Sequence, residues 1–205
     1  IITQINKKVS LLQSKISIFL LPDNNNKEAL KHEIDEIKWK LIELSINNKD
    51  KTENFAHLKN KRIQPFFLWK LEFSDVFREN GGFDIVIGNP PYIQLQKRLH
   101  DNTKIKLGDL YETSKYATFC KTGDIYALFY ELGIKLSKYR GNISFITSNK
   151  WMKAAYGNSL RAFLSKYDLN RLIDFSGNKV FANATVDVNI LSINNIPSTK
   201  NLKAT

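Results

Sequence analysis

The sequence is poor in cysteine and has no long apolar segment. Cys120 is the single cysteine among 205 residues, so the chain cannot form an internal disulfide, which is typical of a reducing compartment. No apolar run approaches the roughly 20 residues that a membrane-spanning helix needs, and no signal-peptide pattern is present. These absences favour a soluble, cytoplasmic protein without a membrane partner.

Residues that could bind a metal ion are also scarce. His32, His57 and His100 are far apart in the sequence, and none of them lies near Cys120. The sequence therefore predicts no metal site and no cysteine nucleophile.

Positive charge is unevenly distributed along the chain. The net charge is +11, and residues 81–205 carry 17 Lys and Arg against 9 Asp and Glu, whereas residues 1–80 carry 14 against 11. The apolar fraction of 42% is that of an ordinary globular protein, and the length suits one domain core. A basic second half favours a polyanionic partner such as nucleic acid. A genome whose base composition favours lysine and asparagine codons would give a similar amino-acid composition.

The first 64 residues predict an antiparallel helical hairpin followed by a short helix. Apolar residues recur at alternating intervals of four and three along two segments: Ile5, Val9, Leu12, Ile16 and Phe19, then Leu30, Ile34, Ile37, Leu41 and Leu44. A connector over residues 21–26 is rich in turn-forming residues, so the two helices fold back on each other. Thr52 caps a short helix that ends before Pro65. We expect the hairpin to pack on itself; binding of a partner helix is the alternative.

A buried strand followed by a rigid turn lies at the centre of the sequence. Residues 83–87 are an apolar run interrupted only by Asp84, which predicts a parallel strand covered on both faces. Asp84 either bonds neighbouring backbone or binds a ligand. Gly88 allows the backbone to bend, and residues 89–92 read Asn-Pro-Pro-Tyr. Ligands of open α/β sheets bind at this end of the strands.

The residues of this turn suit a flat ring that carries an amino group. The Asn89 amide oxygen and the Pro90 carbonyl are two acceptors that can receive the two hydrogens of an NH₂ group. Tyr92 offers an aromatic face against which a ring can stack. Adenine combines both features, so a flipped-out adenine is the expected ligand.

The string GGFDIVIGNPPYI resembles the gamma-class N6-adenine DNA methyltransferases, particularly those fused into single-chain Type IIG restriction–modification enzymes. The resemblance covers about residues 66–194. It implies S-adenosylmethionine as cofactor, double-stranded DNA as partner, and a catalytic turn made of Asn89, Pro90, Pro91 and Tyr92.

Further residues take their expected roles from the same resemblance. Phe181 lies where the family stacks an aromatic ring on the target adenine, opposite Tyr92. The string DIYALF ends in Phe129, which would line the cofactor's adenine pocket together with Pro91. A strand over residues 67–73 would end in Glu72 and Phe73, an acid and an aromatic residue that bind the cofactor's adenine. Ser148 departs from the family, which usually has proline at this position.

Alternating helices and strands follow the turn and predict an α/β fold with a parallel sheet. Residues 93–121 form a long, basic connection, interpreted as a mobile flap over the bound nucleotide or as disorder. A helix capped by Asp124 runs to Gly141. A strand over residues 142–148, a helix with Leu160, Phe163 and Leu164, and strands at 172–175 and 186–193 complete the order.

The resemblance also shows what this stretch does not contain. None of the nine glycines forms the Gly-x-Gly turn with which the family binds the cofactor's methionine part, so the cofactor site is incomplete. Neither a nuclease site nor a sizeable region for reading DNA sequence is present. We therefore expect the carboxyl-terminal half of a catalytic domain, joined to the remainder of a longer polypeptide and inactive alone. An exposed sheet edge would favour dimers.

The fold class expected is thus α/β, a partial Rossmann-like S-adenosylmethionine-dependent methyltransferase sheet preceded by an antiparallel helical hairpin. Its expected parts are residues 1–64 (hairpin and short helix), 65–194 (half of the catalytic domain) and 195–205 (polar tail). Three alternatives stay open: an RNA adenine methyltransferase, a protein glutamine methyltransferase and a non-catalytic helical scaffold.

Overall fold

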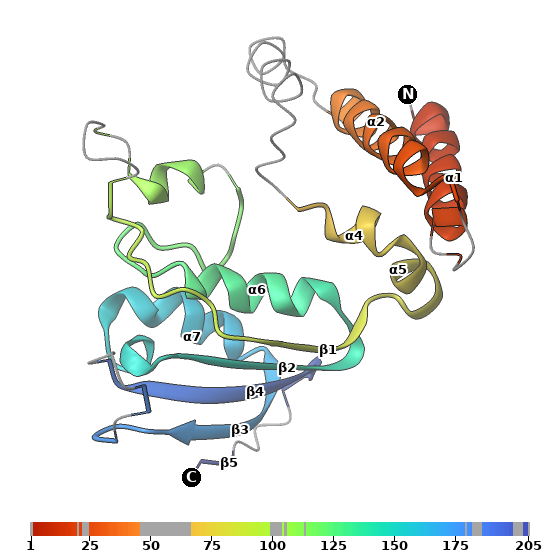
Figure 1. Cartoon of the computed structure of the whole chain (residues 1–205). Helices are drawn as coiled ribbons and strands as arrows, with labels where there is room; N and C mark the ends of the chain where they lie inside the picture. The colour runs from red at the N-terminus through yellow and green to blue at the C-terminus, as the bar shows by residue number, and fades with distance from the viewer. Residues whose placement is uncertain are drawn as a thin grey trace. The chain divides into compact units, whose positions relative to one another are not determined.

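A computed structural model describes residues 2–19, 21, 25–45, 67–98, 104, 106–112, 114–178, 180–181, 186–198 and 203–204. The chain divides into two units, Ile1–Asp75 and Val76–Thr205. The elements of each unit are labelled in Figure 1. The short helix predicted after Thr52 lies outside the described residues. Within the described part of the chain, no helix is long and apolar enough to cross a membrane.

The first unit contains the predicted helical hairpin, which is confirmed. Helices α1 (Ile2–Phe19) and α2 (Lys27–Ser45) pack through the apolar stripes that the sequence shows. Leu12, Ile34 and Leu41 are buried between them, with Val9, Ile16, Phe19 and Ile37 around their edge. Outside these stripes most described positions are polar, but Leu11 and Ile18 of α1 are 45% and 44% exposed.

The prediction of a strand over residues 67–73 is wrong. This segment contains helix α4 (Trp69–Glu72), and helix α5 (Ser74–Asn80) follows it. Trp69 and Phe73 are four residues apart and stack with 6.1 Å between ring centroids. Aromatic residues at alternate positions suit a strand, but the same residues also satisfy the four-residue spacing of a helix.

The second unit contains a mixed sheet with the strand order β1-β2-β4-β3-β5. The strands are β1 (Phe83–Gly88), β2 (Ser137–Ser148), β3 (Tyr167–Asp174), β4 (Val188–Pro197) and β5 (Lys203–Ala204). β1 and β2 are parallel, as predicted, but β4 is antiparallel to both β2 and β3. In the described part of the β3–β4 connection there is no crossover helix, so these consecutive strands pair antiparallel. The predicted α/β class is confirmed, whereas the fully parallel sheet is not.

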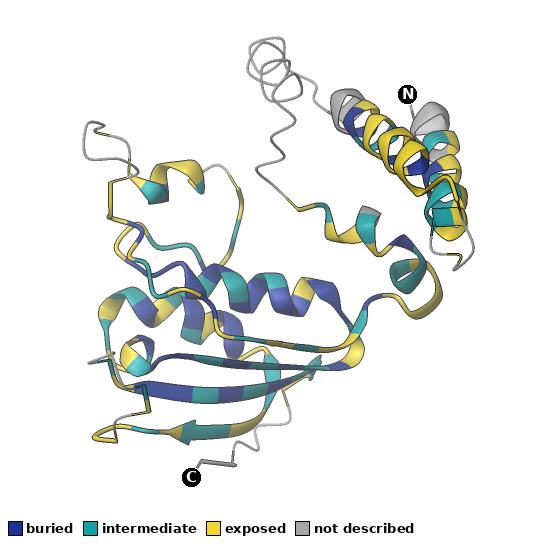
Figure 2. Cartoon of the chain, viewed as in Figure 1, coloured by how far each residue is buried: buried dark blue, intermediate teal, exposed yellow. Residues whose placement is uncertain are grey.

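Helices cover one face of this sheet (Figure 1). They are α6 (Tyr126–Leu136) and α7 (Asn158–Leu164), and three 3₁₀ helices accompany them: η1 (Leu107–Leu110), η2 (Asn149–Met152) and η3 (Ala155–Gly157). Beneath the helices lie the main buried residues of the strands, Ile143, Phe145, Leu191 and Ile193. Figure 2 shows this burial along β2, β4 and α6.

The opposite face of β1 is exposed, which corrects the prediction that this strand is covered on both faces. Ile85 is 67% exposed and Ile87 is 80% exposed, whereas Val86, between them, packs against the core. β1 is the edge strand of the sheet, and alternate side chains of a strand point to opposite faces. The apolar run therefore has one side on the core and one side in solvent.

Candidate functional site

The Asn-Pro-Pro-Tyr turn follows β1 directly, at the carboxyl end of the strand. Asn89 is exposed, Pro90 is buried, Pro91 is exposed and Tyr92 is half-buried. The buried proline anchors the turn, and the exposed amide beside it is available to a ligand. The space just before the turn is tight, because a Cβ on Gly88 would lie 3.3 Å from the Phe145 ring.

Tyr92 is held in place by the core and also faces a hollow. Its ring packs edge-on against Tyr126, with 6.3 Å between centroids, and its hydroxyl donates to the Ile146 carbonyl at 3.4 Å. Burial raises the pKa of Tyr92, so the hydroxyl stays neutral. The hollow has a volume of about 480 Å³ and is lined by Tyr92, Ile93, Gln94, Gln96 and Lys97.

Asp124 fixes the segment that follows the turn. Its Oδ1 accepts from the Ile93 amide at 3.0 Å and from the Tyr126 amide at 3.4 Å. The Ile125 amide donates to the Ile93 carbonyl at 3.0 Å, and the Leu95 amide donates to the Gly123 carbonyl at 2.9 Å. Asp124 thus ties the wall of the hollow to the start of α6. The N-cap residue of α6 is Ile125, and not Asp124 as predicted.

The described residues between the turn and α6 are folded around an apolar cluster of their own. Leu95, Ile125 and Leu128 are buried, and around them pack Ile93, Leu107, Tyr111, Tyr116, Phe119 and Phe129. The Gly108 amide donates to the Leu95 carbonyl at 2.7 Å. This part of the long basic connection is therefore a small structured layer beside the hollow.

Two of the predicted cofactor residues belong to this region of the second unit. Phe129 lies in the first turns of α6, is half-buried, and contacts both the main core and the cluster around Leu95. Pro91 is exposed in the turn. An apolar ring and a proline with free surface can pack against a flat ligand, so both residues fit the predicted role.

Glu72 and Phe73 belong to the first unit, and their surroundings differ from the prediction. Glu72 forms an ion pair of 2.7 Å with Lys38 of α2, and both side chains are mostly buried. Phe73 stacks on Trp69 and is 40% exposed. The strand end on which their predicted cofactor role was based is not present at these residues. Their role in binding the cofactor stays a prediction.

Phe181 is half-buried in a bend, within a connection whose two ends are fixed to the end of β2. The Asn149 side-chain amide donates to Asp174 at 3.0 Å and to Ser176 at 2.7 Å, and its backbone amide donates to the Asp187 carbonyl at 3.1 Å. β1 and β2 are parallel neighbours, so their carboxyl ends share one rim of the sheet. The connection that carries Phe181 therefore begins and ends at the rim that also carries the turn.

A buried polar cluster below this rim was not foreseen. The Tyr130 hydroxyl is 3.1 Å from the Thr147 hydroxyl, which donates to Asn189 Oδ1 at 3.3 Å. Trp151 Nε1 donates to the same oxygen at 3.2 Å, whereas Asn189 Nδ2 has no partner. Burial raises the pKa of Tyr130, so the cluster is uncharged. Its residues are 59 positions apart at most, and no local pattern links them.

Comparison with known proteins identifies the family. The chain matches the model of the Eco57I restriction-modification methylase family over residues 2–181. It belongs to that family. The predicted resemblance to restriction–modification methylases is thereby confirmed, whereas the choice of adenine as target stays a prediction.

The curated relatives that the chain resembles are much longer than the chain itself. The chain is 37% identical over 117 residues to the type II restriction enzyme and methyltransferase RM.Eco57I of Escherichia coli, a match that covers 56% of the chain and 11% of that protein. It is 28% identical over 119 residues to the type II methyltransferase M.BstVI of Geobacillus stearothermophilus, with 58% and 19% covered. The chain thus spans less than a fifth of the length of these relatives.

Two solved structures resemble part of the chain. A cryo-electron microscopy structure of a DrdV–DNA complex matches 65% of this chain and 15% of that chain, with a TM-score of 0.47 and 22% identity. The EcoKI M protein of a type I restriction enzyme matches 59% of this chain and 22% of that chain, with a TM-score of 0.36 and 14% identity.

Proposed function

We propose that this chain forms the base-binding part of a DNA adenine-N6 methyltransferase in a restriction–modification system, within a longer polypeptide. One observation carries the proposal: an exposed amide at Asn89, anchored by the buried Pro90, lies at the end of a sheet strand next to Tyr92 and its hollow. Membership of the Eco57I family supports methyl transfer as the reaction.

The turn would recognise the amino group of an adenine that has left the DNA stack. Asn89 Oδ1 and the Pro90 carbonyl oxygen each accept one N–H, which draws both hydrogens out of the ring plane and gives the nitrogen more lone-pair character. Tyr92 stacks on the base from one side, and Phe181 is proposed for the other side. These contacts replace the stacking that the base lost in the duplex. Most of the rate would come from orientation of the nitrogen.

S-adenosylmethionine is the proposed cofactor, and it supplies a methyl group carried on a positively charged sulfur. Pro91 and the half-buried Phe129 provide apolar surface that fits its adenine ring. Glu72 and Phe73 are proposed as further contacts, and this assignment rests on the family resemblance alone. The methionine part would be bound by residues of the longer polypeptide.

Substitution of Asn89 tests the proposal. In the polypeptide that contains this chain, Asn89→Ala removes one of the two acceptors, and we expect methyl transfer to DNA to fall about 100-fold or more. Incorporation of tritiated methyl groups into duplex DNA measures this loss, with DNA affinity followed in parallel. Asn170→Ala, at another exposed asparagine, is the matched control and should retain full turnover. Retained turnover in Asn89→Ala would refute the role of the turn.

The same assay separates the other methyl acceptors. Ribosomal RNA and a glutamine-containing protein are offered in place of duplex DNA, and the methylated base is identified after hydrolysis. We expect N6-methyladenine in DNA. If methyl groups are incorporated only into RNA or only into protein, that molecule and not DNA is the substrate.

A further inference from the structure

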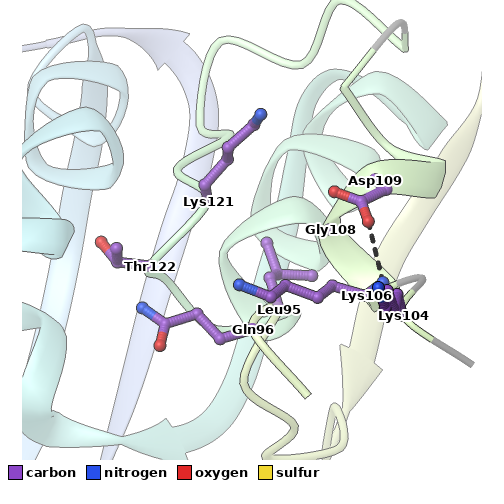
Figure 3. Close-up of a pocket in the computed structure, with 8 residues that line it drawn as sticks. All are labelled: Leu95, Gln96, Lys104, Lys106, Gly108, Asp109, Lys121 and Thr122. Carbon is purple, nitrogen blue, oxygen red and sulfur yellow. Dashed lines mark hydrogen bonds between the residues drawn. The ribbon is translucent and has the colours of Figure 1, made fainter. Parts of the chain in front are cut away.

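A second hollow lies next to the first, and it is lined mainly by polar and basic side chains. Its volume is about 360 Å³, and its lining residues are Leu95, Gln96, Lys104, Lys106, Gly108, Asp109, Lys121 and Thr122. Gln96 lines both hollows, so they are neighbours on the surface of the second unit. Figure 3 shows Lys121 and Thr122 on one side of the hollow and Lys104 and Lys106 on the other.

The charge of the lining favours an anionic ligand. Three lysines and one carboxylate surround the hollow, and Leu95 is its single large apolar residue. A hollow of this size could hold a small organic molecule, but such sites are predominantly apolar. A polar, net positive hollow suits a group with several negatively charged oxygens, such as a phosphate.

The acidic groups around the hollow do not prevent its lysines from binding an anion. Asp109 Oδ2 accepts from the Lys106 backbone amide at 2.8 Å, so this carboxylate stabilises the start of η1. Lys121 forms an ion pair of 2.6 Å with Glu112, and both side chains are more than half exposed. An exposed pair of this kind contributes little to stability, so Lys121 can exchange Glu112 for a ligand oxygen at small cost.

The backbone around the hollow is well supported. Gly108 approaches Leu95 so closely that an added Cβ would lie 3.0 Å from the Leu95 carbonyl oxygen. The Leu107 amide donates to the Lys97 carbonyl at 2.8 Å, which joins η1 to the segment after the turn. Lys106, next to Leu107 in the chain, is therefore mounted on the same structured layer that forms the wall of the base hollow.

We propose that the hollow lined by Lys104, Lys106 and Lys121 binds a backbone phosphate of the DNA strand that carries the target base. The proposal rests on the proposed function, because the neighbouring hollow beside Tyr92 is taken as the base site. A phosphate held next to it would fix the register of the strand while leaving the choice of sequence to other contacts.

A charge-matched pair of variants tests this site by the salt dependence of DNA binding. The first variant is Lys104→Gln, Lys106→Gln and Lys121→Gln. The control carries the same three-charge loss on exposed lysines of the helical hairpin, Lys7→Gln, Lys27→Gln and Lys31→Gln. Dissociation constants for a fluorescent DNA duplex are measured between about 50 and 200 mM salt.

We expect the hollow variant to bind about tenfold more weakly and to lose about 1 from the log–log salt slope. The control should change the dissociation constant by less than about twofold and keep the native slope. Equal effects in both variants, or no effect in the hollow variant, would overturn the site. Equal or tighter binding of an RNA duplex of the same sequence would overturn DNA as the partner.

Inorganic phosphate provides an independent probe that needs no catalysis. In ¹⁵N-labelled protein, phosphate should shift the amide signals of Lys106, Gly108 and Thr122 in a saturable way, and the hollow variant should lose this response. Unchanged signals in the native chain would overturn the site. We expect Asn89→Ala to keep the native salt slope. Loss of methyl transfer in Asn89→Ala therefore tests the proposed function, whereas loss of salt slope in the hollow variant tests the phosphate site.

Discussion

Asp124 connects two parts of the second unit through one carboxylate. It accepts hydrogen bonds from the backbone of both Ile93 and Tyr126, and it is 9% exposed. Burial raises the pKa of this carboxyl, and the backbone donors oppose the shift only in part. A buried acid with a raised pKa binds its proton more tightly in the folded protein than in the unfolded chain.

The pH dependence of stability follows from this shift. Because the folded state holds the proton more tightly, the contribution of Asp124 to stability is present at low pH and is lost as pH rises through the raised pKa. Relative to Asp124→Asn, which keeps an acceptor oxygen and does not titrate, the native chain should lose stability progressively as pH rises above about 4, the ordinary pKa of an aspartate. Urea denaturation of both proteins at each pH measures the difference. A difference that grows in the opposite direction would contradict the assignment.

At the scale of single residues, the sequence predicted the Asn-Pro-Pro-Tyr turn but not the hydrogen bonds that hold the segment after it. Asn89, Pro90 and Tyr92 form a continuous motif, so their location at a strand end could be read directly from the chain. The link between Asp124 and Ile93 joins residues 31 positions apart, and only folding reveals it. Ser148, where the family usually has proline, has φ −58°, the value that a proline ring would impose, so the substitution keeps the local backbone.

At the scale of elements, the residue before β1 lies very close to the junction between α6 and β2. Gly82 has φ +151°, and an added Cβ would lie 2.6 Å from the Leu136 carbonyl oxygen and 2.8 Å from the Lys138 nitrogen. These contacts are backbone atoms at the junction of α6 and β2. They can move only if one of these elements moves.

Substitution at this junction should therefore be costly. We expect Gly82→Ala to lower the free energy of unfolding by about 2–4 kcal/mol, through backbone strain and overlap with fixed atoms. Gly81→Ala is the matched control, because Gly81 also has a positive φ (+76°) but has nothing within 4 Å of an added Cβ. Its cost should be about 1 kcal/mol. Urea denaturation measures the free energy of unfolding of both variants. Equal losses would show that the backbone around Gly82 shifts to make room for the added Cβ.

Periodicity predicted most elements of this protein, and its failures have physical causes. The hairpin helices, β1, α7 and most of α6 and β2 follow from local patterns of apolar residues. The predicted end of the helix at Gly141 is wrong, because α6 ends at Leu136 and β2 begins at Ser137. Residues 67–73 satisfy strand and helix spacing at once, and the ion pair between Glu72 and Lys38 of α2 joins residues 34 positions apart. The antiparallel direction of β4 likewise depends on pairing with β2 and β3, which no local pattern records.

At the scale of the whole molecule, the exposed side of β1 is the largest departure from the sequence-based expectation. The run from Phe83 to Ile87 predicted cover on both faces, but cover is supplied by other elements and cannot be read from the strand itself. Ile85 and Ile87 are exposed on an edge strand. Exposed apolar edges promote pairing with another chain.

We expect the 205-residue chain to self-associate through this edge. Ile85→Lys with Ile87→Lys should remain monomeric at concentrations at which the native chain associates, because charge on an edge strand opposes pairing. Its stability should change by less than about 0.5 kcal/mol for each exposed position. Sedimentation velocity measures the association.

The matched control replaces Leu21 and Leu110 with lysine. These residues are 56% and 55% exposed and lie outside β1, so the control should still associate. Loss of association in both variants would show that added positive charge anywhere on the chain prevents association, and that the β1 edge has no special role.

The tie between Asp124 and the segment after the turn has a mechanical consequence. That segment is held by the residues just before α6, because Ile93 is hydrogen-bonded to Asp124 and Ile125, and Leu95 to Gly123. Helix α6 is itself packed into the main core through Tyr130 and Ile134 and continues directly into β2. The wall of the opening beside Tyr92 is therefore anchored to the centre of the sheet through this helix, although it lies on the surface.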